Sequence, residues 1–463
     1  MKELPFIVGS QYYRAPTPVK QDWDRDLALF ASKGLNTIKI WAQWRWNNPA
    51  EGVYQFDDVL ELLDLAGKHG LSVVVNTIFD VAPAWVFRKW PECPMVTVTG
   101  RVLGPQTLGH RQIGGTPGPC LHHTPSMEVA QQFLAECAKA LRDAPALLLW
   151  DAWNEPELTC AVAREPKIDN LVCYCDHSIA KFGDWLRARY GEDVAALNHA
   201  WGRNYQNWEE VEAPASFGTF RDLLDWRLFF VDTITEELRT RVRILKEHDP
   251  THAVMAHTVP FPIFNLVTCA SDDFELAATC DLFGNSAGSS AQAADLLSSA
   301  AAGKVVFNAE VHAMGGSTWY QNKPLADSEM DRFLLAPLAQ NMKGYLFWQY
   351  RPERLGLESP NWGLTDLSGN TTPWLERLAK VNGELQRRKD FLLRARPRRA
   401  EVGLLLDPEN ELFNWSISQS MDFYASAVRG EYDALHRAGF QVRFVHSRSE
   451  ERRVGKAARP RWS

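Results

Sequence analysis

The sequence lacks the features that would assign it to a membrane or to a nucleic acid. It contains no run of about 18 apolar residues, so we expect no membrane-spanning helix. The first residues, MKELPFIVGSQYY, hold no long apolar segment of the kind found in secretory signals, which predicts a cytoplasmic protein. The net charge is −7, and the lack of a basic surplus argues against nucleic acid or an anionic membrane as a partner.

Cysteine is scarce, with eight residues in a chain of 463. Because a large chain without a secretion signal is expected to meet reducing conditions, we expect free thiols or metal ligands in place of disulfides. Tryptophan, in contrast, is abundant, with 18 residues. Its flat apolar ring suits both a hydrophobic core and the stacking of sugar rings, and composition alone does not separate these roles.

Short apolar runs alternate with amphipathic segments along most of the chain. Strands are expected at 6–13, 36–41, 71–79, 147–153, 253–258, 281–286, 304–311 and 343–350. Helices are expected at 22–33, 57–69, 126–143, 178–190, 226–248, 290–301, 327–340 and 374–390. Eight alternating units with near-continuously apolar strands predict a (β/α)8 TIM barrel. The alternative, an open doubly wound sheet, would need a glycine-rich phosphate turn after an early strand, and GSQYYRAP is not one.

The pattern changes after residue 390, so we assign a catalytic barrel to residues 1–390. Residues 391–446 begin with a linker and then show one strand–helix–strand unit, which predicts the start of a second α/β domain. Two strands and a helix are too few for a stable core, so this domain is expected to be incomplete. Residues 447–463 are basic and aperiodic, which predicts a disordered tail that is not native to the protein.

Two carboxylates occupy matching places in the expected barrel. Glu155 follows the fourth strand in the segment WNEP, and Glu310 ends the seventh strand. Taken alone, Glu155 is explained by a turn as well as by a catalytic role. Glu310 alone is explained as well by a solvent-exposed acid at a strand end. Together, at the mouth of one barrel, they fit the acid/base and the nucleophile of a retaining glycosidase, whose carboxyl groups lie about 5–5.5 Å apart.

Longer segments resemble glycoside hydrolase family 42, the β-galactosidases, from residue 6 to about residue 445. They are WRWNNPAEGVYQFDDVLELLDLAGKHGLSVVVNT (44–77), APAWVFRKWPE (82–92), CYCDH (173–177) and LNHAWGRNYQNWEEV (197–211). The resemblance implies that Glu155 is the acid/base, that Glu310 is the nucleophile and that Asn154 binds the sugar 2-hydroxyl. It also implies contacts with the sugar from Arg111, Trp319, Trp348 and Glu358.

The sequence departs from the family pattern beside the acid/base. Trp153 stands where the family has an aspartate, Pro156 stands where it has an aromatic residue, and Arg111 lies farther from the following cysteine. These departures leave a β-glucoside, mannoside or xyloside open as the substrate. The other classes considered are a sugar-binding barrel without catalysis, against which the two glutamates argue, and a zinc-dependent hydrolase, for which no set of three histidines is visible.

A cysteine cluster matches a metal site of the family. The resemblance implies a structural zinc ion held by Cys120, Cys173 and Cys175, with Ser178 at the position of the fourth cysteine. Cys160 or His177 is expected to complete the tetrahedral shell. The resemblance implies no cofactor for the chemistry itself, and it implies a homotrimer when the second domain is complete.

Overall fold

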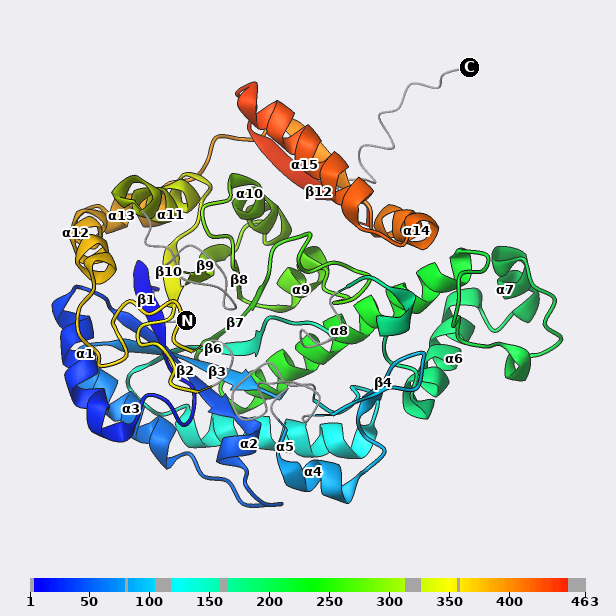
Figure 1. The fold of residues 1–463 in the computed structure, drawn as a ribbon, viewed down its shortest axis with the longest axis horizontal. Coiled ribbons are helices and arrows are strands. Elements are labelled where there is room, and N and C mark those ends of the chain that lie inside the picture. The colour runs from blue at the N-terminus through cyan, green and yellow to red at the C-terminus, as the bar shows by residue number, and fades with distance from the viewer. Residues whose placement is uncertain are drawn as a thin grey trace.

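The computed structural model describes residues 4–79, 82–104, 118–158, 165–312, 326–355 and 359–448. Within these residues eight parallel strands close into a barrel in the order β1-β10-β9-β8-β7-β6-β3-β2, which confirms the predicted fold (Figure 1). The barrel strands are β1 (Ile7–Tyr13), β2 (Thr37–Gln43), β3 (Ser72–Ile78), β6 (Leu147–Asn154), β7 (Ala253–Thr258), β8 (Leu282–Asn285), β9 (Val305–His312) and β10 (Gly344–Trp348). No helix in this part of the chain is long and apolar enough to cross a bilayer.

Helices surround the barrel and continue beyond it (Figure 1). They are α1 (Trp23–Ser32), α2 (Trp44–Asn47), α3 (Asp57–Lys68), α4 (Ala84–Lys89), α5 (Thr124–Leu141), α6 (Asp176–Tyr190), α7 (Val194–Trp201), α8 (Arg221–His248), α9 (Asp273–Thr279), α10 (Ala291–Ala300), α11 (Asp327–Ala339), α12 (Pro373–Arg387), α13 (Lys389–Arg394), α14 (Pro408–Ser418) and α15 (Asp422–Arg437). The sequence patterns did not predict α9 and α14. Both begin at aspartate caps, because Asp272 accepts backbone N–H groups of α9 and Asp407 accepts one of α14.

Side chains alternate between the two faces of each barrel strand. In β2, Ile38 and Ile40 belong to the large core beneath the helices, whereas Lys39 and Trp41 contact residues of other strands across the barrel interior. A separate apolar cluster fills the interior toward the amino ends of the strands. It contains Ile7, Val74, Leu149, Ala253, Met255, Leu282, Phe307, Ala309 and Leu346. The charged side chains of Lys39 and Asp151 lie farther toward the carboxyl ends, where barrel enzymes build their sites.

Two long connections enlarge the carboxyl face. The connection after β3 carries α4 and the antiparallel pair β4 (Met95–Val96) and β5 (Val102–Leu103), and the connection after β6 carries α6 and α7. Figure 1 shows α6 and α7 beside the far end of the long helix α8. A bridge between Thr97 and Val172 joins the two connections. Elements that are distant in sequence are thus tied together at one edge of the barrel mouth.

A smaller unit follows α13. Its strands β11 (Val402–Leu406) and β12 (Val442–His446) pair in parallel, and α14 and α15 run between them. It packs on α10, where the Tyr432 hydroxyl donates to Asp295 Oδ2 at 2.6 Å and the Phe444 N–H donates to Ser299 Oγ at 3.0 Å. Figure 1 shows this unit beside α10, outside the ring of barrel strands.

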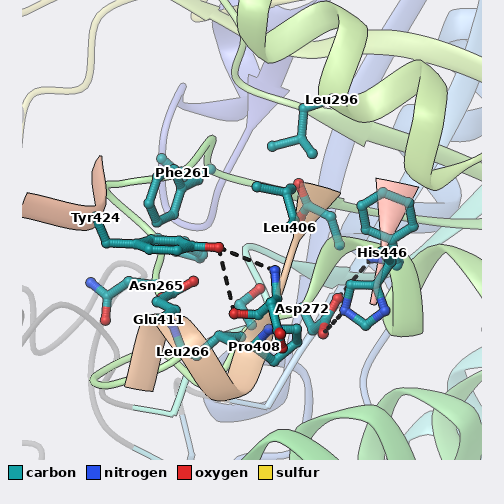
Figure 2. Close-up of a pocket in the computed structure, with 16 residues that line it drawn as sticks. Phe261, Asn265, Leu266, Asp272, Leu296, Leu406, Pro408, Glu411, Tyr424 and His446 are labelled. Atoms are coloured by element: carbon teal, nitrogen blue, oxygen red, sulfur yellow. Dashed lines mark hydrogen bonds and ion pairs between the residues drawn. The ribbon is translucent and has the colours of Figure 1, made fainter. Parts of the chain in front are cut away.

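A cavity lies between this unit and the barrel (Figure 2). Phe261, Asn265, Leu266 and Asp272 line it from the segment after β7, and Leu406, Pro408, Glu411, Tyr424 and His446 line it from the second unit. His446 pairs with Asp272 at 3.0 Å, and Glu411 accepts the Leu266 N–H at 2.8 Å. Burial raises the pKa of Glu411 to about 8, so this carboxyl is held in its neutral form at the junction.

Glu411→Gln is expected to remove the loss of folding stability that the ionisation of Glu411 causes at high pH. The folded pKa of Glu411 lies above its ordinary value of 4.5, so the carboxyl favours the folded state at low pH. That contribution is lost as the pH rises from about 4.5 through 8. In thermal unfolding, Glu411→Gln should therefore be more stable than the wild type at pH 8 and similar to it at pH 5. Glu431→Gln on the exposed face of α15 is the control; an equal shift at both pH values would contradict the assignment.

Gly284 in β8 is expected to tolerate no side chain. A Cβ at this position would lie 2.5 Å from the Ala309 Cβ and 3.1 Å from the His257 Cβ. Gly284→Ala should therefore push β9 away and lower the free energy of unfolding by about 1–3 kcal/mol, as overpacking does. Urea unfolding measures this. The control is Gly430→Ala on the exposed side of α15, where a Cβ meets no atom within 4 Å; it should stabilise slightly. Equal stability of the two variants would refute the close packing.

Candidate active site

Glu155 and Glu310 face each other at the carboxyl ends of the barrel strands. Glu155 directly follows β6, and Glu310 lies in β9. A carboxylate oxygen of each and a ring nitrogen of His257 all lie within 4.8 Å of one another. Two carboxylate oxygens this close agree with the roughly 5–5.5 Å between the carboxyl groups of retaining glycosidases.

The backbone at Glu155 is unusual. Its φ is +54°, in the left-handed region that residues other than glycine rarely occupy. The Glu155 N–H donates to the His257 carbonyl at 2.9 Å, which continues the contact of β6 with β7 for one residue beyond the strand. Residues held in this region are concentrated at functional sites, where the surrounding structure outweighs their strain.

The surroundings of Glu310 favour its ionised form. Burial acts to raise the pKa of Glu310, but His257 and His312 outweigh it, and the pKa lies below the ordinary value. The Nε2 atoms of these histidines lie 3.6 Å and 3.7 Å from the two oxygens of the carboxylate. A buried carboxylate that stays ionised is suited to act as a nucleophile.

Asn154 is the last residue of β6 and lies above a buried charged layer. Its Oδ1 accepts a hydrogen bond from Lys39 Nζ at 3.0 Å. Lys39 also pairs with Asp151 at 2.5 Å, and His257 Nδ1 lies 3.2 Å from the same carboxylate. The sequence reasoning missed Lys39, Asp151 and His257. The available signal was a charged residue in the middle of each of two apolar strands, NTIKIW and LLLWDAW.

Aromatic side chains form one wall of the barrel mouth. Trp348, at the end of β10, clusters with Trp41, Ile78 and Trp362, and its ring centroid lies 5.9 Å from that of Trp41. The guanidinium of Arg14 lies over both rings, 4.8 Å from Trp41 and 4.5 Å from Trp348. Trp348, for which the resemblance implies a sugar contact, thus lies at the barrel mouth beside Trp41.

An ion pair holds this wall in place. Two nitrogens of Arg14 donate to the two carboxylate oxygens of Glu353, each at 2.6 Å, and both side chains are buried. A bidentate pair fixes the plane of the guanidinium, and with it the two indole rings on which the guanidinium lies. The sequence reasoning did not find this pair. The other predicted sugar contacts, Arg111, Trp319 and Glu358, lie outside the described residues.

Three of the predicted metal ligands come together between the two long connections. The Sγ atoms of Cys120, Cys173 and Cys175 lie within 4.8 Å of one another. Hydrogen bonds from the first two thiols lower the pKa of Cys175. Ser178 Oγ lies 3.2 Å from Cys120 Sγ and 3.6 Å from Cys175 Sγ.

Backbone N–H groups also point to the sulfurs, from Val96 to Cys173 Sγ and from His122 to Cys120 Sγ, each at 3.4 Å. The three sulfurs therefore fit three of the four positions of a tetrahedral zinc site, and Ser178 Oγ lies beside them. Of the two residues expected to complete the shell, Cys160 lies outside the described residues, and the His177 ring packs against His123 with centroids 4.9 Å apart.

Comparison with known proteins agrees with the fold and with the resemblance seen in the sequence. The family model for glycoside hydrolase family 42, described as beta-galactosidase, matches residues 12–388. A beta-galactosidase of Geobacillus kaustophilus is 25% identical over 94% of this chain and 64% of its own length. One from an Arthrobacter species is 28% identical over 95% of this chain and 62% of its own length. The chain therefore spans a little under two thirds of these relatives.

A crystal structure of the beta-galactosidase from the psychrophilic Marinomonas ef1 has the same fold. It superposes with a TM-score of 0.83 at 20% identity and covers 96% of this chain and 70% of its own. The family match extends over most of the chain and includes the strands that carry both glutamates. The chain belongs to glycoside hydrolase family 42.

Proposed function

We propose that this chain is a retaining glycoside hydrolase that removes terminal β-linked galactose, with Glu155 as acid/base and Glu310 as nucleophile. The separation of at most 4.8 Å between oxygens of the two carboxylates carries the mechanism. The descriptions of the family and of the relatives as beta-galactosidases support galactose as the sugar. The homotrimer and the cytoplasmic location stay predictions.

The reaction proceeds in two displacements at the anomeric carbon. In the first, the Glu310 carboxylate attacks this carbon and forms a glycosyl ester, while the protonated Glu155 donates its proton to the departing oxygen. In the second, the Glu155 carboxylate takes a proton from water, and the water oxygen displaces Glu310 from the sugar. The released sugar keeps its β configuration, Glu310 returns ionised and Glu155 returns protonated.

The surrounding residues support these roles. Glu310 needs no prior deprotonation because its neighbouring histidines keep its pKa below the ordinary value. Asn154 lies next to the acid/base, with its Oδ1 already bonded to Lys39, so its amide N–H groups are the atoms left for the sugar. The Trp41 and Trp348 wall offers apolar ring surface for the less polar face of a sugar.

The two glutamates should give different products when their side chains are removed and azide is added. Glu155→Ala should lower turnover about 10²–10⁴-fold, as loss of general acid–base catalysis does, and azide should restore it with formation of β-galactosyl azide. Glu310→Ala should be almost inactive, and azide should yield α-galactosyl azide. Hydrolysis of 4-nitrophenyl β-galactoside and NMR of the products measure both, with Glu136→Gln on the outside of the barrel as control. Full activity in either alanine variant would refute the assignment.

We propose in addition that Cys120, Cys173 and Cys175 hold a structural zinc ion, with the Ser178 hydroxyl as the nearest fourth donor. The distances among the three sulfurs and the Ser178 oxygen support this set. When bound, zinc would cross-link the connections after β3 and β6 and would not take part in the chemistry.

Substitution of a cluster cysteine should lower the zinc content of the protein, whereas substitution of a buried cysteine elsewhere should not. Protein produced with zinc should contain about one equivalent by elemental analysis. Cys120→Ser should lose it and unfold at a lower temperature, because metal binding contributes to folding stability. Ser178→Cys, which supplies a fourth sulfur, should retain zinc longer against a chelator. Cys137→Ser in α5 is the matched control and should keep its zinc. Zinc-free wild type from zinc-supplied cultures would refute the proposal.

A further inference from the structure

We propose that Lys39 is a positioning residue of the active site, which orients the Asn154 amide and the His257 ring toward the bound sugar and the nucleophile. This inference rests on the proposed function, because it assigns a role in the same reaction. The charge of Lys39 also helps to lower the pKa of Glu310, but the role proposed for Lys39 is one of positioning. It acts through the two side chains that it holds.

The contacts of Lys39 account for all three protons of its ammonium group. Lys39 Nζ lies 2.5 Å from Asp151 Oδ2, 3.0 Å from Asn154 Oδ1 and 3.4 Å from His257 Nδ1. The Lys39 and Asp151 side chains are fully buried, at 0% exposure. An ammonium group donates three hydrogen bonds and accepts none, so any partner that bonds to Lys39 must present an acceptor.

This requirement decides the orientation of the Asn154 amide. Its oxygen and its nitrogen have similar shapes, and either could face a neighbour, but only the oxygen can accept from Lys39. The amide nitrogen therefore lies on the other branch of the side chain, with two N–H groups available to the sugar. Asn154 is then placed to donate to the 2-hydroxyl oxygen.

The same layer bears on which nitrogen of His257 carries a proton. When Nδ1 of the neutral ring accepts from Lys39, the proton is on Nε2. In the protonated ring, Nδ1–H faces Asp151 Oδ2 at 3.2 Å, and Nε2 carries a proton as well. In both states an N–H faces the Glu310 carboxylate, whose oxygen lies 3.6 Å from Nε2.

Stability alone does not account for this charged layer. A buried ion pair is often no more stabilising than apolar side chains of similar volume, because both charges lose their water. The cluster nearer the amino ends of the same strands shows that this barrel interior also holds apolar side chains. The Lys39–Asp151 pair lies beside Asn154 and His257, and His257 in turn faces Glu310.

The test compares two substrates that differ only in the 2-hydroxyl. The first variant is Lys39→Met, which keeps the length of the side chain but donates nothing. The second is Lys39→Met with Asp151→Asn, which leaves no uncompensated charge in the barrel, in case the single variant does not fold. The matched control is Lys343→Met. Lys343 is also buried but donates to the carbonyls of Leu392 and Ala395, outside the site.

We expect the wild type to hydrolyse 4-nitrophenyl β-galactoside with a much higher kcat/KM than its 2-deoxy analogue. In the Lys39 variants this preference should fall about 10-fold or more, the loss expected when one hydrogen bond in the transition state is misaligned. Lys343→Met should keep the wild-type preference even if it lowers the Tm. In an Asn154→Ala background, Lys39→Met should cause no further loss of the preference, because the two residues act in series.

The outcomes separate this inference from the proposed function. A wild type that hydrolyses no β-glycoside overturns the proposed function and this inference with it. An active wild type whose preference for the 2-hydroxyl is unchanged in the folded Lys39 variants overturns this inference alone. Equal loss of preference in Lys343→Met would also overturn it, because a general loss of stability would then explain the effect.

Discussion

The contact between Lys39 and Asp151, at 2.5 Å inside the barrel, is the interaction on which the active site depends most directly. Its two partners come from β2 and β6, which both pair with β3. Loss of either partner would leave a buried charge without compensation, at a cost of about 3–5 kcal/mol. The pair therefore favours one relative position of these strands. It also lies next to Asn154 and His257, so the position of the charges decides how these side chains are presented.

The barrel interior is organised in layers along the strands. An apolar cluster lies toward the amino ends, the layer with Lys39 and Asp151 comes next, and the two glutamates lie beside the carboxyl ends. Each layer influences the next one toward the carboxyl ends of the strands. The apolar cluster keeps water from the charges, which strengthens their interaction, and the charges fix the hydrogen bonding of the residues around the glutamates. The aromatic wall is held separately, by the Arg14–Glu353 pair.

The extensions beyond the barrel hold parts of the chain together and do not carry the two glutamates. The connections after β3 and β6 meet at the cysteine cluster, where a metal ion would join two long segments that a backbone bridge also connects. The unit formed by β11, β12, α14 and α15 packs on α10 and encloses the cavity of Figure 2, whose lining includes neither catalytic glutamate. Titratable groups in that cavity bear on how the two units hold together, and those of the barrel mouth bear on the reaction.

The sequence by itself determined the class of fold and the placement of two glutamates at the ends of barrel strands. Alternation of apolar strands with amphipathic helices is a local pattern, so the eight barrel strands were predicted close to their observed positions. Glu155 and Glu310 were recognisable because each stands at a strand end, and parallel strands bring such ends together at one face. The short helices α9 and α14 were missed because aspartate caps, and no long apolar periodicity, define them.

Only the tertiary structure decided the surroundings of these groups. Lys39, Asp151 and His257 are far apart in sequence, and nothing in a strand pattern tells which interior residues of different strands lie at the same height. That depends on the stagger of strands that closure of the barrel imposes. The same holds for Arg14 and Glu353, which meet because β1 pairs with β10 and closes the barrel. The sequence therefore singled out the two glutamates that we propose as the reacting groups, and the closed barrel decided which residues surround them.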